Sequence, residues 1–374
     1  MLLLYVPFCF SPPAHFCCSP ALFPQCKLFL PSWITCNWFN SLVGSGRKDL
    51  ACAALIRRDM GHLCTCFDAK KGANFRLCDV NGRTTELLEI ESDNPALHVV
   101  FVPGNPGIVT FYKDFVEYLY TLLEGKASVT AVGHISFTEK NWERCKLFSL
   151  QQQIDHKVDF IEQECLKTPI VLIGHSIGSY MCLEILRRVD RKIVYMMGLY
   201  PFLKLNPSSK KQKKYCKLAK NSFLSTFTSF TISILAFMPK CVRRYVASKS
   251  IGKLWSPAAI DAACSHLVKY HTFRNMLFLA NSEFQKLSED LDWQFIKENE
   301  NRIAFLFGVD DHWGPLHIHE EISAKVPKVA LAIEKEGHMH SFCVTEAGSL
   351  WAAQHAAGLA RTFLHPKLQA NGEV

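Results

Sequence analysis

A serine between two glycines is the residue of this chain best placed to do covalent chemistry. Residues 174–178 read GHSIG, with Ser176 at the centre, after an apolar stretch at 170–173 and before a helical pattern. A serine on such a strand–turn–helix corner is lifted above the sheet edge, where its hydroxyl can attack a carbonyl carbon. The turn is so tight that the flanking residues must be small, as Gly174 and Gly178 are. The pattern predicts a nucleophile at Ser176, although the same motif also occurs by chance in loops.

A nucleophilic serine needs a base to take its proton and an acid to orient that base. Two aspartates, Asp310 and Asp311, follow one late predicted strand, and two histidines, His338 and His340, follow the next. Serine, acid and histidine occur in this chain order in one large class of serine hydrolases. The carboxyl ends of parallel strands meet at one edge of a sheet, so we expect these loops to lie together. The spacing leaves open which aspartate and which histidine acts.

The oxygen of an attacked carbonyl becomes negative and needs two backbone N–H donors. We expect one donor to be the N–H of Ile177, directly after the serine. The other should come from the loop after the strand predicted at 97–102, which reads PGNPG over residues 103–107. Because Pro106 has no N–H, Asn105 is the expected donor.

The elements that must position these residues alternate along the chain. Strands are predicted at 75–78, 85–90, 97–102, 127–135, 170–173, 193–199, 302–307 and 329–333, and helices at 111–123, 150–165, 180–189, 316–326 and 345–364. This alternation predicts an α/β fold, with a mostly parallel sheet and helices on both faces. It stops for about a hundred residues, which predicts a cap inserted at about 204–300. We expect this domain over 74–366, an irregular leader at 1–58 and a flexible tail at 367–374.

Composition limits the remaining possibilities. The 374 residues are 49% hydrophobic and 20% charged, which is enough for a sizeable core. No stretch of 18 strongly apolar residues occurs, so we do not expect a simple membrane span. The sixteen cysteines lack the paired spacing of a metal site, and we expect neither a metal nor a cofactor.

Positive charge is concentrated in one segment. The net charge is +8, and residues 191–260 contain fourteen Lys or Arg and no Asp or Glu. This favours a local anionic partner over general nucleic-acid binding. The uncharged run at 222–238 lies between basic clusters, which suits a phospholipid monolayer: its phenylalanines enter the acyl region while the flanking cations meet phosphates. The alternative is an ordinary cap helix packed on the site, with a solvated basic loop before it.

The residues expected to meet such a lipid surface are Lys210, Lys211, Lys213, Lys214, Phe223, Phe227, Phe230, Arg243 and Arg244.

Three motifs together resemble the lipid droplet-associated hydrolase family. They are PGNPG at 103–107, QIDHK at 153–157 and GHSIGSY at 174–180, and the resemblance covers about 75–363. It implies an α/β-hydrolase fold, and we expect a plant member. It also implies a location on the cytosolic side of lipid droplets, with the endoplasmic reticulum as a second location.

The resemblance also implies roles for single residues. The nucleophile of the family falls on Ser176, and its acid falls on Asp311, with Asp310 as the alternative. The family's histidine precedes a small residue and a phenylalanine, a pattern that matches His340. This favours His340 over His338, although a histidine directly after a glycine is the more general pattern for the base.

Two functions therefore compete. One is a serine-dependent hydrolase that acts on a hydrophobic lipid ester, of the sterol ester or acylglycerol type, at the droplet surface. Its partners would be that ester and the phospholipid monolayer, without nucleic acid or metal. The other is a droplet-associated scaffold on a hydrolase fold with little or no activity, since a fold does not by itself confer chemistry. An intact serine, histidine and aspartate set favours the enzyme.

Overall fold

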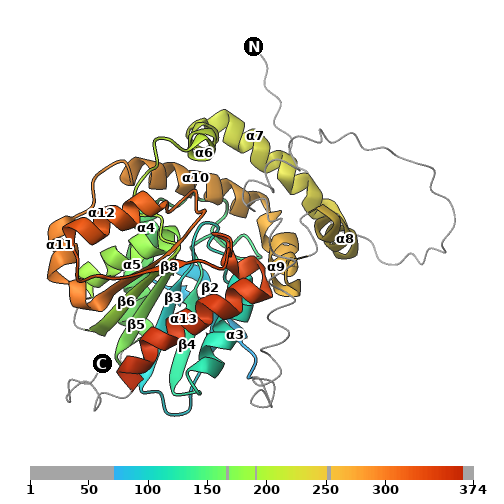
Figure 1. The fold of residues 1–374 in the computed structure, drawn as a ribbon. Coiled ribbons are helices and arrows are strands. Elements are labelled where there is room, and N and C mark those ends of the chain that lie inside the picture. Colours follow the sequence, from blue (N-terminus) through green and yellow to red (C-terminus); the bar gives the residue numbers. More distant parts are fainter. Residues whose placement is uncertain (1–70, 166–167, 190–191, 251–253, 365–374) are drawn as a thin grey trace, which may run out of the picture.

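An eight-stranded sheet runs through the part of the chain that the computed structural model describes, which is residues 71–165, 168–189, 192–250 and 254–364 (Figure 1). The leader predicted at 1–58 and the tail predicted at 367–374 lie outside the described residues.

The strands lie in the order β1-β2-β4-β3-β5-β6-β7-β8. Only β2 runs against the others, because it pairs antiparallel with both β1 and β4, while every other pair is parallel. Their bounds are β1 (Asn74–Val80), β2 (Arg83–Ile90), β3 (Leu97–Val102), β4 (Ala127–Val132), β5 (Ile170–His175), β6 (Ile193–Leu199), β7 (Ile303–Gly308) and β8 (Ala330–Glu334). The mostly parallel sheet that we predicted is confirmed.

The central strands are buried on both faces, as continuous apolar runs require. Every residue of β4, β5 and β7 is buried. The strand predicted at 127–135 was too long, because the chain leaves the sheet after Val132. There the N–H of His134 donates to Gly107 O at 3.0 Å instead of continuing the ladder.

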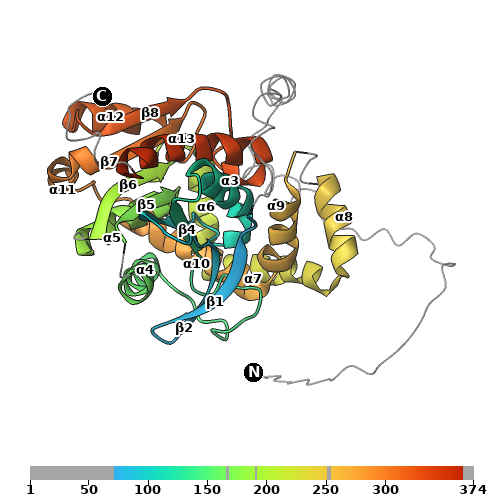
Figure 2. The ribbon, with the colours of Figure 1, turned by 90° about the horizontal axis from the view of Figure 1, so that it is seen from below.

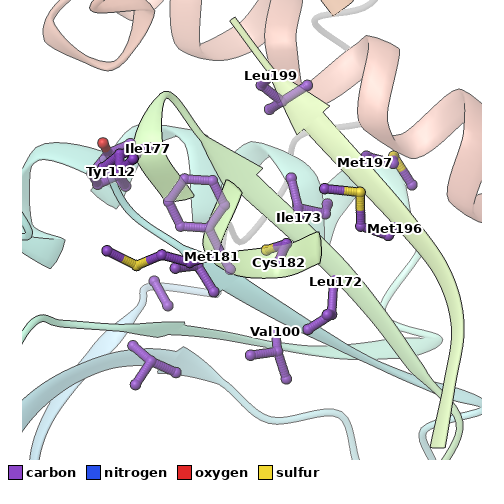
Figure 3. Close-up of a cluster of buried hydrophobic side chains, with 14 of the residues drawn as sticks. Val100, Tyr112, Leu172, Ile173, Ile177, Met181, Cys182, Met196, Met197 and Leu199 are labelled. Atoms are coloured by element: carbon purple, nitrogen blue, oxygen red, sulfur yellow. The ribbon is translucent and has the colours of Figure 1, made fainter. Parts of the chain in front are cut away.

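Helices cover both faces of the sheet. On one face α3 (Lys113–Leu122) packs against α13 (Glu346–Leu364), and on the other α4 (Leu150–Glu164) packs against α5 (Ile177–Arg188) (Figure 2). Between β7 and β8 lies α12 (Leu316–Lys325), and the short helices η2 (Val109–Tyr112) and η7 (Phe342–Val344) precede α3 and α13. The core between β5, β6 and α5 contains Leu172, Ile173, Met181, Cys182, Met196 and Met197 (Figure 3).

A helical insertion separates β6 from β7, in the stretch where we predicted the cap. Its elements are α6 (Lys210–Lys220), α7 (Ser222–Ser233), η4 (Ile234–Phe237), α8 (Lys240–Ser250), α9 (Pro257–Ala262), η5 (Ala263–Leu267), α10 (Tyr270–Lys286), α11 (Trp293–Glu298) and η6 (Glu300–Arg302). Both α6 and α7 pack on α10, while α7 and α8 extend away from the sheet (Figure 1). We call α6 to α10 the cap.

Among the described residues, no helix taken alone has the length and apolar character to cross a membrane. The stretches Ser222–Phe237 and Lys240–Lys249 meet those criteria only as a pair, and the chain bends by 118° between them.

The corner between β5 and α5 is a place where main chains approach too closely for a side chain. A Cβ atom added to Gly178 would lie 2.3 Å from Val102 O, and one added to Gly174 would lie 2.4 Å from Gly178 O. Both obstacles are backbone atoms, which cannot rotate away. Glycine at these two positions lets α5 begin directly against the ends of β3 and β5.

We predict that Gly178→Ala lowers the free energy of unfolding by about 3 kcal/mol or more, because the methyl group forces two backbones apart. Gly358→Ala is the matched control: Gly358 lies within α13, and a Cβ atom there meets nothing within 4 Å. That change should raise stability by about 0.5–1 kcal/mol, since alanine is the better helix former. Urea-induced unfolding of both variants measures this, and equal effects would contradict the steric argument.

Candidate active site

Ser176 occupies a strained backbone conformation at the end of β5. Its φ is 54° and its ψ is −123°, a region that residues with a side chain rarely adopt. The neighbouring main chain fixes this conformation. The N–H of Ser176 donates to Leu199 O at 3.1 Å, and Ser176 O accepts from the N–H of Phe202 at 3.1 Å. The corner therefore depends on the end of β6 as well as on its own glycines.

The structure brings Ser176, Asp311 and His340 together. His340 Nε2 lies 2.9 Å from Ser176 Oγ, and His340 Nδ1 lies 2.7 Å from Asp311 Oδ2. The two alternatives lie elsewhere: Asp310 is exposed, and the ring of His338 lies 6.0 Å from that of Trp351 on α13. Of the two aspartates and the two histidines that the sequence left open, Asp311 and His340 are the members of the hydrogen-bonded set with Ser176.

The environment of Asp311 keeps this carboxyl ionised. Burial by itself would raise the pKa of Asp311, but the charge on His340 and hydrogen bonds from its ring and from the Trp313 N–H, at 2.8 Å, outweigh that effect and hold the pKa below its usual value. An ionised carboxylate only accepts, so His340 Nδ1 donates to it. When the His340 ring carries this one proton, Nε2 is the acceptor for the hydroxyl of Ser176.

A buried acid that we did not predict shapes the loop before His340. Glu334, the last residue of β8, is 1% exposed. Its carboxylate accepts the backbone N–H groups of Glu336 at 2.5 Å, Gly337 at 3.0 Å and His338 at 3.1 Å. Burial raises the pKa of Glu334, and these hydrogen bonds oppose that rise. By accepting these three N–H groups, the Glu334 carboxylate fixes the turn that orients His340.

A chain of hydrogen bonds behind the serine joins three parts of the site. Burial lowers the pKa of His175 to about 3, so its ring is neutral. His175 Nε2 faces His340 O at 2.8 Å and must donate, because a carbonyl only accepts. His175 Nδ1 then accepts from the Tyr112 hydroxyl at 2.7 Å, and Tyr112 Oη accepts from the Gly104 N–H at 3.1 Å. Neither Tyr112 nor His175 was singled out from the sequence.

The loop at 103–107 lies against the serine. A Cβ atom on Gly104 would be 3.0 Å from Ser176 Cβ. Within the described chain, the N–H groups of Asn105 and Ile177 have no hydrogen-bond acceptor. The Asn105 side chain is held by α10, since its Nδ2 donates to Met276 O at 2.9 Å and to Glu283 Oε1 at 3.0 Å.

A cavity of about 130 Å³ opens on Ser176 and His340. Two larger hollows, of about 360 and 1010 Å³, include none of the three residues Ser176, Asp311 and His340. The wall of the smaller cavity is mostly aromatic and aliphatic, and the cap contributes Tyr215, Trp255, Leu267, Met276, Leu277, Ala280, Glu283 and Phe284. Trp313, from the loop that carries Asp311, stacks near Phe284 with ring centroids 6.3 Å apart. The cavity therefore suits an apolar ligand.

The outer face of α7 and η4 is apolar. Phe223, Phe227, Phe230 and Phe237 are 81%, 57%, 61% and 88% exposed. The buried face carries Ser225 and Ser229, which are inaccessible to water, together with Ile232. Exposed phenylalanines on the outer side are the opposite of what a surface helix in a water-soluble domain usually shows. We call this row of exposed phenylalanines the phenylalanine face.

The basic residues beside the phenylalanine face divide into two groups. Lys210, Lys213 and Lys214 of α6 are exposed, and Lys211 is half-buried. Arg243 and Arg244 each have a partner within the protein, although the side chain of Arg244 is still 42% exposed. The guanidinium of Arg243 donates to Cys264 O, and that of Arg244 pairs with Asp261. These inward contacts occupy both arginines, whereas the lysines of α6 stay directed to solvent.

No group of three His, Cys, Asp or Glu side chains arranged to hold a metal ion is found among the residues that the structure describes.

The sequence of this chain is similar to known proteins of one family. The family described as lipid-droplet associated hydrolase matches residues 95–343. A lipid droplet-associated hydrolase of Gallus gallus is 27% identical over 292 residues, which cover 73% of this chain and 87% of that protein. One of Dictyostelium discoideum is 25% identical over 283 residues, covering 70% and 88%.

Solved structures share the fold at low sequence identity. A haloalkane dehalogenase of Agrobacterium tumefaciens has a TM-score of 0.60 at 12% identity, over 78% of this chain and 98% of that one. A putative lipase of Acinetobacter baumannii has a TM-score of 0.53 at 16% identity, over 78% and 92%. The α/β-hydrolase fold that we predicted is thereby confirmed. The plant origin stays a prediction.

We predict that Tyr112→Phe lowers the free energy of unfolding by about 1–3 kcal/mol, because the buried Gly104 N–H and His175 Nδ1 both lose their partner. Tyr245→Phe is the control: Tyr245 is 65% exposed, and its change should stay within about 0.5 kcal/mol. Urea-induced unfolding measures both. Equal values for the two variants would mean that the buried chain contributes nothing to stability.

Proposed function

The chain belongs to the lipid droplet-associated hydrolase family, and from this premise we propose that it is a serine hydrolase. Its substrate is an acyl ester of a hydrophobic lipid, of the sterol ester or acylglycerol type, met at the droplet surface. The observation that carries the proposal is the hydrogen-bonded set of Ser176, His340 and Asp311 at an apolar cavity. That contact also favours the enzyme over the inactive scaffold, which requires no such alignment.

The geometry supports a two-step acyl transfer. Ser176 Oγ attacks the ester carbonyl carbon while His340 Nε2 takes the hydroxyl proton, and Asp311 stabilises the imidazolium that forms. The proton then passes to the leaving alcohol, which departs and leaves an acyl-serine. A water molecule, deprotonated by His340, attacks the acyl-serine and releases the fatty acid.

We assign the oxyanion hole to the backbone N–H groups of Ile177 and Asn105. Each N–H lacks an acceptor within the described chain. Ile177 directly follows Ser176, and Asn105 directly follows Gly104, which lies against Ser176. The start of α5 adds a favourable positive potential where the negative oxygen develops. The Gly104 N–H is already engaged by Tyr112, so it is not available for this role.

The phenylalanine face supports binding to a phospholipid monolayer. Exposed apolar side chains in a row, next to the exposed lysines of α6, match the two requirements of an interfacial helix: apolar insertion and attraction to phosphate. The alternative of an ordinary cap helix would bury the phenylalanines against the site, whereas the serines occupy that side. We propose the cytosolic side of the droplet as the location, and the leaflet of the endoplasmic reticulum as the second surface.

We predict that Ser176→Ala lowers kcat by about 10⁴-fold or more without unfolding the protein, because only the attacking oxygen is lost. His340→Ala should be comparably damaging, and His338→Ala, which removes a histidine outside the hydrogen-bonded set, is the matched control. Hydrolysis of a soluble ester measures the activity of each variant, and labelling by a fluorophosphonate measures the reactivity of Ser176. A folded Ser176→Ala protein that keeps a tenth of the activity or still labels would reject Ser176 as nucleophile.

We predict that Phe223→Ser, Phe227→Ser and Phe230→Ser combined weaken binding to phospholipid-coated oil droplets at least tenfold, since each buried phenylalanine contributes about 1.5–3 kcal/mol. Hydrolysis of a soluble ester should not change. Phe75→Ser with Leu77→Ser is the control, because these β1 side chains are 51% and 52% exposed outside the phenylalanine face. Flotation of protein with droplets gives the measurement, and equal loss in both proteins would argue against a specific face.

A further inference from the structure

An acid from the cap reaches the loop beside the nucleophile. Glu283, on α10, is 4% exposed and forms part of the cavity wall. Its Oε1 accepts from Asn105 Nδ2 at 3.0 Å, and the same nitrogen donates to Met276 O at 2.9 Å. Met276 and Glu283 are about two helical turns apart, so α10 holds the Asn105 side chain at two points.

The cavity wall around this acid contains no Lys or Arg side chain among the residues that the structure describes. A carboxylate without a cation in an apolar wall is costly, so the acid takes a proton instead. Burial raises the pKa of Glu283 to about 8, although the Asn105 hydrogen bond acts in the opposite direction. The neutral acid still offers its carbonyl oxygen to Asn105.

We propose that Glu283 is a positioning residue: as an uncharged acid it holds Asn105, and through it the backbone N–H that stabilises the oxyanion. The inference rests on the proposed function and extends it to a residue of the cap. It makes α10 part of the catalytic geometry as well as a wall of the cavity.

The physical reason is the short range of oxyanion stabilisation. Donors act when they lie about 2.7–3.1 Å from the developing negative oxygen. A loop freed by the loss of Glu283 would no longer keep the Asn105 N–H at that distance. An ionised Glu283 would also place negative charge beside a site that must accept more of it.

The sign of the pH dependence follows from this. The favourable neutral form is present below the pKa of Glu283, near 8, and is lost as pH rises through it. Other titratable groups of the cavity wall are Tyr112, His175, Tyr215, His340 and Cys343. Several elements pack on α10 and carry further titratable groups. Those of α6 are Lys210, Lys211, Lys213, Lys214, Cys216, Lys217 and Lys220, those of α4 are Asp155, His156, Lys157, Asp159, Glu162 and Glu164, and those of η5 are Cys264 and His266, whereas α7 has none. On α10 itself are Tyr270, His271, Arg274 and Lys286. Only a limb that disappears with Glu283 can therefore be assigned to it.

The experiment compares Glu283→Gln, Glu283→Leu and a control, Gln285→Leu, in the full chain with a soluble ester. Gln285 is on the exposed side of the same helix. We expect Glu283→Leu to lower kcat by about 10- to 100-fold with a small change in KM, as loss of alignment does. Glu283→Gln keeps the acceptor, so it should retain kcat at neutral pH and should not show the decline in kcat above pH 8 that we expect of the unmodified protein. Gln285→Leu should match the unmodified protein.

Three readouts separate this inference from the proposed function. Wild-type activity that is abolished by Ser176→Ala, together with unchanged kcat in folded Glu283→Leu, would overturn the inference alone. An alkaline decline that persists in Glu283→Gln would overturn it as well. A crystal structure of Glu283→Leu tests positioning without any turnover: we expect the Asn105 side chain to leave Met276 O and the 103–107 loop to shift, and an unmoved loop would overturn the proposal even if no ester is hydrolysed.

Discussion

The contact between the start of α5 and the ends of β3 and β5 is the constraint on which the rest of the site depends. Gly178 lies so close to Val102 O that no side chain fits between them. This approach, together with the hydrogen bonds of Ser176 to Leu199 and Phe202, holds Ser176 at a positive φ. Ile177 is the first residue of α5, so its N–H has no partner within the helix. The nucleophile and one oxyanion donor thus belong to the same corner.

The second requirement is that loops from distant parts of the chain stay in register with this corner. Neutral, buried hydrogen bonds achieve much of this, because Tyr112 and His175 connect Gly104 to His340 O without any charge. The acid Glu334 holds the turn before His340 in place through hydrogen bonds to its backbone N–H groups. In a dry site such bonds are strong, and losing one leaves a buried group unsatisfied. The alignment of Ser176 and His340 is therefore determined by partners that do not react.

The sequence was informative where function depends on local spacing and uninformative where it depends on tertiary packing. The glycines around Ser176, the alternation of strands and helices, and the two loops that carry aspartates and histidines follow from short patterns. The choice of Asp311 over Asp310 rested on family resemblance, because neighbouring residues on a loop differ only in direction. Glu283 and Tyr112 gave no signal, since their partners are 178 and 63 residues away. Arg243 and Arg244 read as surface cations because Asp261 and Cys264, which hold them, are visible only in the fold.

The sequence did not indicate which face of α7 is exposed, because a helix that carries both serines and phenylalanines can turn either face to water. Once its serines are found against the protein, the exposed phenylalanines require an apolar partner. That helix packs on α10 and α6, and α10 also supplies Met276 and Glu283 to the cavity wall. On the proposed function, α10 therefore contacts both the helix that meets the lipid surface and the cavity that opens on Ser176. The cavity wall that a lipid ester would meet is mostly aromatic and aliphatic, so the wall replaces part of the apolar surroundings that the ester leaves.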